Sequence, residues 1–353
     1  MSGHHQTQTT HVHPAHPPPH HASTAPRITL SFTPPGPEFF ISETADMPVI
    51  KATAKLENVT LAANQAVEFV WSAAVHYEGL HCAHSMGRHT NHKAMHARTP
   101  TGEWTIPFTQ TRGGTLTVTV QVHVNHLKLS ATGHKLSIGG TNPSATTLIT
   151  VSYPNETFKK LMRLESGLQQ FRTAGGAATS HCPLFSGDNK GGVGICQVTD
   201  PAPSDEEVWS WKENVKAGIR FWKAKESGAK SFVVHQQNGQ HFKDLVKRFN
   251  QQRHQHGQPP ITITLPDFTD DQLEKDTLRG FNGYAGGWHE YRIATDAHGH
   301  LVVTIDPGGT TGTAEWHRNT AAERRAHYQA INLDTKNWGD PNYVDDVLSQ
   351  ASF

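Results

Sequence analysis

The spacing of apolar residues changes near residue 152, and this change divides the chain into two parts. Between residues 27 and 151, segments such as ITLSF, AVEFVWSAAV and LTVTVQVHV alternate or are rich in β-branched residues, with Gly, Pro, Asn and Asp between them. This pattern predicts short strands joined by turns. After residue 152 the apolar residues recur at helical intervals. We therefore expect an α+β protein of two domains, with an immunoglobulin-like antiparallel β-sandwich at 27–151 and a mainly α domain at 152–353.

Composition narrows the classes of partner. The 353-residue chain has 31 basic and 31 acidic residues, which gives no support for a nucleic acid as the main partner. No apolar run approaches the roughly 20 residues of a membrane span, and the start, MSGHHQTQ, lacks the pattern of a signal peptide. Residues 1–26 are rich in His and Pro and poor in large apolar groups, so we expect a disordered tail there.

One carboxylate interrupts an apolar helical face near the start of the second part. At helical spacing, Phe158, Leu161, Met162, Glu165 and Leu168 share a single face. Apolar surroundings disfavour the charged form of a carboxyl group, and an acid that keeps its proton at neutral pH can act as a general acid. Glu165 is therefore either a general acid or a residue at the edge of the face that extends into water.

Local capping signals predict where helices begin. We expect Ser152 to cap the helix that carries Glu165, with Pro154 in its first turn. Two capping-box patterns, at 204–207 and 269–272, predict two further helix starts. Other segments predict, in chain order, a helix at 232–250, a β-hairpin insertion near 290–306 and a last helix ending in VDDVLS.

Glycines crowd a stretch about thirty residues after Glu165. Gly191, Gly192 and Gly194 precede the sequence Ile-Cys-Gln that ends at Gln197. Glycines allow unusual backbone angles and let a ligand approach the main chain closely. The side chain of Gln197 offers both a donor and an acceptor. This stretch is therefore a candidate for binding substrate near Glu165.

Taken in order, these motifs resemble a known enzyme family. The chain reads Glu-Ser at 165–166, Gly-Asp at 187–188, GVGICQ at 192–197, the helical segment WKENVKAGIRFW, and FNGY at 281–284. Their order and spacing over residues 154–288 resemble the lysozyme-like lytic transglycosylases and goose-type lysozymes of glycoside hydrolase family 23. A weaker similarity continues at Tyr343-Val344.

The resemblance implies a lysozyme-like α domain that cleaves peptidoglycan at the β-1,4 bond between N-acetylmuramic acid and N-acetylglucosamine, without a cofactor. Glu165 is implied to act first as acid and then as base. In the transglycosylases a tyrosine stands where this chain has Phe281, and Tyr284 is one candidate to replace the missing hydroxyl. The implied substrate-binding residues are Ser166, Gly194, Gln197, Phe281, Asn282 and Tyr284.

A second carboxylate would decide between two mechanisms. Asp188 lies where goose-type enzymes place an acidic residue that holds water, which would give hydrolysis of the lysozyme (muramidase) type. Asp200 is another candidate, although it comes one residue later than that pattern places it. The resemblance implies that a lytic transglycosylase needs Glu165 alone and forms a 1,6-anhydro product. We favour the transglycosylase and keep hydrolysis as the alternative.

The cysteines and histidines leave two alternatives open. Cys182 and Cys196 bracket the glycine stretch, and either they form a disulfide or Cys196 is a small buried apolar residue. Segment 81–96 is rich in His, with Cys and Met, and is either a zinc or copper site or an exposed loop. Its spacing fits no standard zinc module, so we assign no metal there, although His92 and His96 would share one face of a helix.

The resemblance and the absence of a signal-peptide pattern together fit a phage lysin or a toxin delivered by a contractile secretion apparatus. Such a protein would act on peptidoglycan strands in the periplasm or outside the cell, with the delivery apparatus or an immunity protein as a further partner. A non-catalytic glycan-binding or baseplate-type structural protein is the competing class, and a metal-binding protein is a third.

Overall fold

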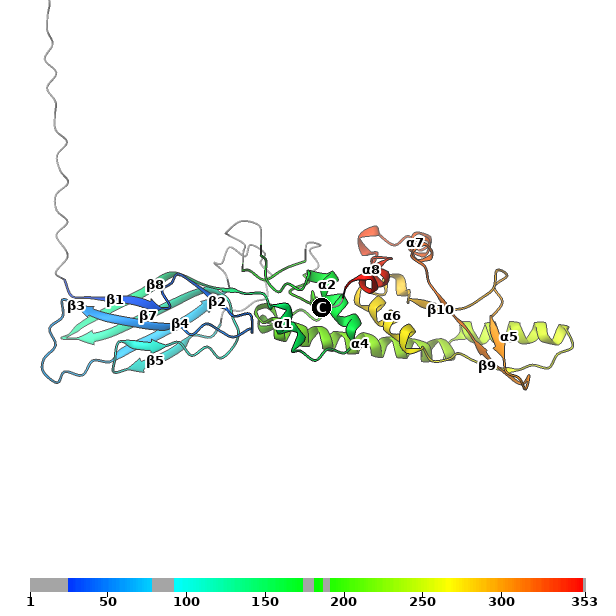
Figure 1. Ribbon diagram of the computed structural model, residues 1–353, viewed down its shortest axis with the longest axis horizontal. Helices are drawn as coiled ribbons and strands as arrows, with labels where there is room; N and C mark the ends of the chain where they lie inside the picture. Colours follow the sequence, from blue (N-terminus) through cyan, green and yellow to red (C-terminus); the bar gives the residue numbers. More distant parts are fainter. Residues whose placement is uncertain (1–24, 78–91, 174–180, 187–190, 352–353) are drawn as a thin grey trace, which may run out of the picture.

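The computed structural model describes residues 25–77, 92–173, 181–186 and 191–351. The molecule is elongated, with one group of strands at one end, a long helix through the middle and a second, smaller group of strands at the other end (Figure 1). Antiparallel sheets and helices are both present, so the expected α+β class is confirmed. Within the described ranges, no helix is long and apolar enough to cross a bilayer.

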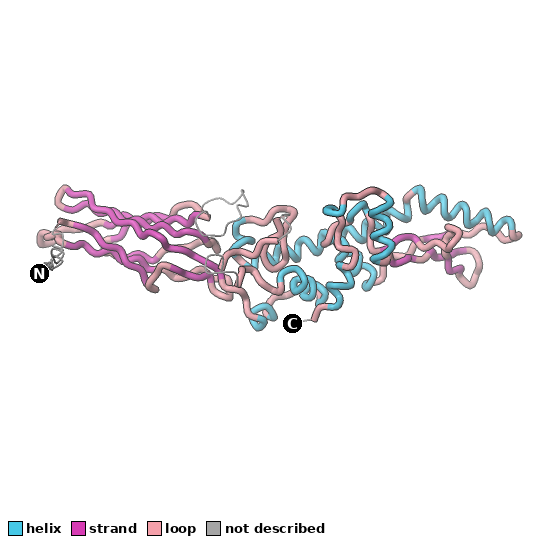
Figure 2. The backbone as a smooth tube through the Cα atoms, turned by 90° about the horizontal axis from the view of Figure 1, so that it is seen from above, coloured by secondary structure: helices cyan, strands magenta, loops and turns pink. Residues whose placement is uncertain are grey.

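The first group of strands forms two sheets around one core (Figure 2). One sheet has the order β1 (Arg27–Thr33), β3 (Lys51–Glu57), β6 (Glu103–Thr105), and all its pairs are antiparallel. In the other sheet β2 and β8 pair in parallel and the remaining pairs are antiparallel. Its order is β2 (Glu38–Ile41), β8 (Leu127–Gly140), β7 (Gly114–Val124), β4 (Phe69–His76), β5 (Met95–Thr99).

Alternation along the strands produces this core. Every second side chain of β4 and β7 is buried, as for Trp71 and Val120, while their neighbours lie nearer to solvent. Trp71 and Trp104 come from different sheets, and their ring centroids lie 5.8 Å apart. His92 and His96 do not share a helix face, because β5 begins at Met95 and pairs with β4.

Helices form most of the remaining chain. Both predicted capping boxes are confirmed, at the starts of α3 and α6, but α2 is capped by Asn155 and not by Ser152. The helices are α1 (Ala145–Ile149), α2 (Glu156–Ser166), α3 (Asp205–Trp209), α4 (Trp211–Asn238), α5 (Gln240–Gln255), α6 (Asp270–Phe281), α7 (Ala321–Ala330) and α8 (Tyr343–Ser349), with 3-10 turns at Ala285–Gly287 and Thr335–Asn337.

The helix expected at 232–250 is divided between two elements. Phe232 belongs to α4, and the chain leaves helical geometry at Gly239 before α5 begins. Apolar residues continue at helical spacing on both sides of this break, so the periodicity does not reveal it. Helices α2, α4, α6 and α8 share a second core, which includes Phe158, Leu161 and Val344.

The second group of strands lies beside α5 and shares a third core with it (Figures 1 and 2). Within the expected hairpin insertion near 290–306 a turn forms at 296–299, and the amide of Asp296 donates to the carbonyl of His300 over 2.8 Å. The strands on its two sides nevertheless pair with different partners. The sheets are β10 (Tyr291–Ile293) with β13 (Trp316–Arg318), and β11 (Val303–Ile305), β12 (Thr311–Ala314) and β9 (Thr262–Thr264) in that order.

Packing is continuous across residue 152. Phe171 and Trp209, which come after this residue, belong to the core of the two N-terminal sheets. The indole nitrogen of Trp211 donates to the carbonyl of Glu43 over 2.8 Å. A mostly buried ion pair of 2.7 Å joins Arg112 to Asp205. The strands and the helices therefore stabilise one another.

We expect Trp209→Ala to lower the free energy of unfolding by about 3–5 kcal/mol, because Trp209 is almost fully buried against Phe171 and the backbone of Gly113. Urea denaturation followed by circular dichroism measures this loss. Trp288→Ala is the matched control, since Trp288 is only half-buried and lies in another region, and it should cost less. An unchanged unfolding midpoint for Trp209→Ala would show that this contact does not couple the two parts.

Candidate active site

Glu165 lies in the last turn of α2 and is half-buried. Phe158, Leu161 and Met162 on the same helix are fully buried, as their spacing predicts. Leu168 does not continue this face, because α2 ends at Ser166 and Gly167 adopts a left-handed conformation. Leu168 still packs against the same core. Glu165 is thus held at the point where an apolar helix face reaches the surface.

Tyr343 contacts the carboxyl group of Glu165 directly. It is the first residue of α8, it is 5% exposed, and its hydroxyl donates a hydrogen bond to Oε1 of Glu165. Burial and the neighbouring Glu165 carboxylate raise the pKa of Tyr343 well above its usual value. The phenol therefore stays protonated and remains a hydrogen-bond donor across the physiological pH range. Sequence reasoning placed Tyr343 only at a weak motif similarity and gave it no role.

The three candidates in the FNGY motif make contacts with residues other than Glu165. Phe281 packs edge-on against Phe221, with ring centroids 4.9 Å apart. The hydroxyl of Tyr284 donates to the backbone carbonyl of Asp276 over 3.3 Å. Asn282 accepts a hydrogen bond from the buried Arg279. In this conformation, then, Tyr343 supplies the hydroxyl beside Glu165, and Tyr284 does not.

Ser166 joins α2 to the glycine stretch. Its hydroxyl is 2.9 Å from the carbonyl oxygen of Ile195 and 3.1 Å from that of Met162, within the preceding turn. The amide of Gln169 also donates to this hydroxyl. Ser166, predicted to bind substrate, is thus occupied in fixing the glycine stretch next to Glu165.

Two buried amide side chains fix the glycine stretch through hydrogen bonds to its backbone. Gln170 accepts from the amide of Ile195 over 3.1 Å and donates to the carbonyl of Val208 over 2.8 Å. Asn214, on α4, accepts from the amide of Cys196 over 2.9 Å. Both side chains are fully buried, so these bonds satisfy polar groups that have no access to water. Asn214 belongs to the predicted family-like helix, whereas no sequence signal singled out Gln170.

These amides explain why the stretch needs glycine at Gly194. This residue has a φ of 72°, and a Cβ atom there would collide with Gln170 and come within 2.7 Å of Asn214. Gln197 also has a positive φ, of 46°, and its side chain donates to the carbonyl of Gly194 over 2.8 Å. Gln197 therefore stabilises its own turn, while remaining half-buried and close to the surface.

Cys196 is a free, buried thiol, so the alternative in which it pairs with Cys182 is wrong and the alternative of a small buried residue is confirmed. Cys182 is in a disulfide, and the third cysteine of the sequence, Cys82, lies outside the described residues. Burial, followed by the nearby carboxylate of Glu165, raises the pKa of Cys196 well above that of an ordinary thiol. Such a thiol is a packing residue and not a nucleophile.

The remaining candidates are exposed or lie outside the described ranges. Asp188 and most of the histidine-rich segment 81–96 belong to the residues that the structure does not describe. Asp200 is exposed. Within the described part of the chain, no three His, Cys, Asp or Glu side chains gather as metal ligands.

Comparisons of this chain with models of protein families, with curated proteins and with solved structures found no significant match. The geometry around Glu165 is therefore the main basis for a functional proposal.

The close contact between α4 and the site predicts opposite effects for two glycines of the same helix. A Cβ atom at Gly218 would lie 2.5 Å from Sγ of Cys196, whereas one at the exposed Gly228 would meet nothing within 4 Å. We expect Gly218→Ala to destabilise the protein by about 1–3 kcal/mol through overpacking. Gly228→Ala should stabilise it by about 0.5–1 kcal/mol through helix propensity. Thermal unfolding of both variants is the measurement, and equal shifts would contradict the close packing at Gly218.

Proposed function

We propose that this protein is a peptidoglycan-cleaving enzyme, a lytic transglycosylase that acts on the β-1,4 bond between N-acetylmuramic acid and N-acetylglucosamine. The observation that carries the proposal is the hydrogen bond from Tyr343 to Glu165. It orients a carboxyl group at the surface end of an apolar helix, beside a turn that is fixed by buried amides. A carboxyl group oriented in this way is suited to general acid–base catalysis.

In the proposed mechanism Glu165 acts twice. Its protonated carboxyl group gives a proton to the glycosidic oxygen as the bond to C1 breaks. The resulting carboxylate then takes the proton of the C6 hydroxyl of the same sugar while that oxygen attacks C1. The product is a 1,6-anhydro ring, and Glu165 recovers its proton. Tyr343 is a positioning residue, because it acts through the carboxyl group of Glu165 and the proposed mechanism gives it no contact with the sugar.

We also propose that the N-terminal strands form an immunoglobulin-like domain that positions the lysozyme-like part on its substrate. Support comes from the two sheets that share one core and from the Trp209 and Arg112 contacts described above. The enzyme would act at the bacterial cell wall, in the periplasm or outside the cell, after delivery by a phage or a secretion apparatus.

We expect Glu165→Gln to lower the rate of cell-wall cleavage by at least about 10²–10⁴-fold, because an amide can neither donate nor recover the proton. Glutamine keeps the size of the side chain, so the melting temperature should change little. The assay is the clearing of purified cell walls, with thermal unfolding measured in parallel. A folded and fully active variant would refute the enzymatic proposal and favour a non-catalytic glycan-binding or structural protein.

Tyr343→Phe is expected to lower kcat by about tenfold and to leave KM nearly unchanged, because it removes one hydrogen bond to the carboxyl group and keeps the buried ring. Steady-state kinetics on soluble glycan strands separates the two constants. Tyr284→Phe is the matched control and should retain full activity, since that hydroxyl contacts the backbone of Asp276. Equal effects of the two substitutions would argue against the role of Tyr343.

The released muropeptides should carry 1,6-anhydro ends, which mass spectrometry distinguishes from reducing ends. Asp188→Asn should then keep most of the rate, because the proposed mechanism uses one carboxyl group. Reducing ends that are lost with this substitution would instead identify a hydrolytic lysozyme with two acting carboxylates.

A further inference from the structure

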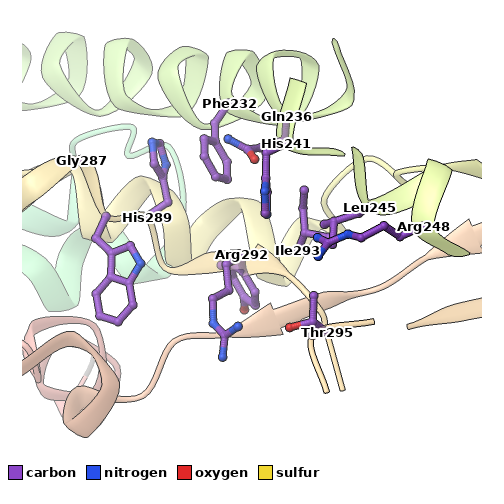
Figure 3. A pocket seen from close by; sticks show the side chains of 13 residues that line it. Phe232, Gln236, His241, Leu245, Arg248, Gly287, His289, Arg292, Ile293 and Thr295 are labelled. Carbon is purple, nitrogen blue, oxygen red and sulfur yellow. The ribbon is translucent and has the colours of Figure 1, made fainter. Parts of the chain in front are cut away.

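A pocket of about 500 Å³ lies where α4, α5 and β10 meet (Figure 3). Its volume is within the range of small-molecule sites. Asn214, which supports the glycine stretch, and Phe232, which lines the pocket, are both on α4 and lie about 27 Å apart along this helix. The pocket is therefore separate from the proposed catalytic site.

The side chains that line this pocket are basic, aromatic, apolar or neutral polar. The ionisable ones are Arg248, Arg292, His241, His289 and the phenol of Tyr291, and no Asp or Glu is among the described lining residues. Such a lining favours a negatively charged ligand.

Two carboxylates that contact basic lining side chains are already bonded to them. Asp276 is fully buried and holds Nδ1 of His289 at 2.8 Å. Glu323 pairs with Arg292 over 3.0 Å. Asp276 and Glu323 thus orient two of the basic groups without lining the pocket themselves.

Arg248 is a basic lining group that remains available. It is exposed, and within the described ranges it makes no ion pair or side-chain hydrogen bond. Figure 3 shows its side chain extending from α5 toward Ile293. A guanidinium group binds carboxylate or phosphate through two parallel hydrogen bonds. An anion in the pocket would therefore gain this contact without displacing an existing partner.

Flat and apolar side chains also line the pocket, together with Gln236 and Thr295. Phe232 stacks on His289 with ring centroids 3.7 Å apart and an interplanar angle of 12°. Trp288, Leu245 and Ile293 also line the pocket. Aromatic groups in a pocket favour ligands that present a flat ring. The lining thus suits a ligand with an anionic end and a planar body.

We propose that this pocket binds a small organic anion in which a carboxylate or a phosphate ester is attached to a planar ring. The proposal does not depend on peptidoglycan cleavage, because the pocket is formed by residues separate from Glu165 and Tyr343. Arg248 and Arg292 bind the anionic group, and Phe232 and Trp288 contact the ring.

Isothermal titration calorimetry of the full chain tests this proposal with matched probes. Benzoate carries the ring and a carboxylate, phenyl phosphate the ring and a phosphate, benzamide the ring alone and acetate the charge alone. We expect saturable binding of benzoate or phenyl phosphate, and the tighter of the two identifies the preferred anionic group. Benzamide and acetate should bind at least about tenfold more weakly. Failure of both aromatic anions to bind, or acetate binding as tightly as they do, would overturn the proposal.

Two variants of α5 assign the binding to this pocket. Arg248→Gln should weaken binding of the tighter aromatic anion by about tenfold or more, because it removes a charge-assisted contact. Lys247→Gln makes the same change of charge on the preceding residue, which is exposed and does not line the pocket. This substitution should leave the affinity unchanged. Equal weakening by the two substitutions would reduce the effect to net charge and overturn the proposed site. Unchanged melting temperatures would show that both variants are folded.

Discussion

The position of Tyr343 depends on two buried arginines. Arg279 donates to the carbonyl of Asp340 over 2.8 Å, and Arg324 donates to that of Pro341 over 3.0 Å. These carbonyls directly precede α8, so the two guanidinium groups fix the point from which Tyr343 enters the core. A fully buried guanidinium group cannot exchange these partners for water. The contact between α8 and Glu165 is therefore set by polar bonds as well as by apolar packing.

The glycine stretch is fixed from two directions in a similar way. Gln170 connects it to α3 through the carbonyl of Val208, and the next residue, Phe171, lies in the core of the N-terminal sheets. Asn214 holds it from α4. Since each amide is fully buried, shifting the stretch would leave donors and acceptors unsatisfied. The strands at one end of the molecule thus contribute to the geometry around Glu165.

Local signals in the sequence were sufficient for the parts of the fold that depend on neighbouring residues. Strand alternation and both capping boxes are of this kind, and so is the buried face of α2 up to Glu165. The sequence could not reveal the bond between Glu165 and Tyr343, because 178 residues separate them and only the packing of α8 brings them together. The break at Gly239 was also missed, since apolar spacing continues through it.

The motif residues around Glu165 mostly bond to one another, and this bears on how a family-like pattern should be interpreted. Ser166, Gly194 and Gln197 hold the turn in place, and each has its position fixed before any ligand is present. Groups that are already oriented need no reorganisation during a reaction, which is the main advantage of a preorganised site. The proposed chemistry needs a hydroxyl that lies close to the carboxyl group in space. The position in the sequence that provides this hydroxyl can differ. Because Tyr343 provides it from α8, the phenylalanine at position 281 is compatible with the proposed chemistry.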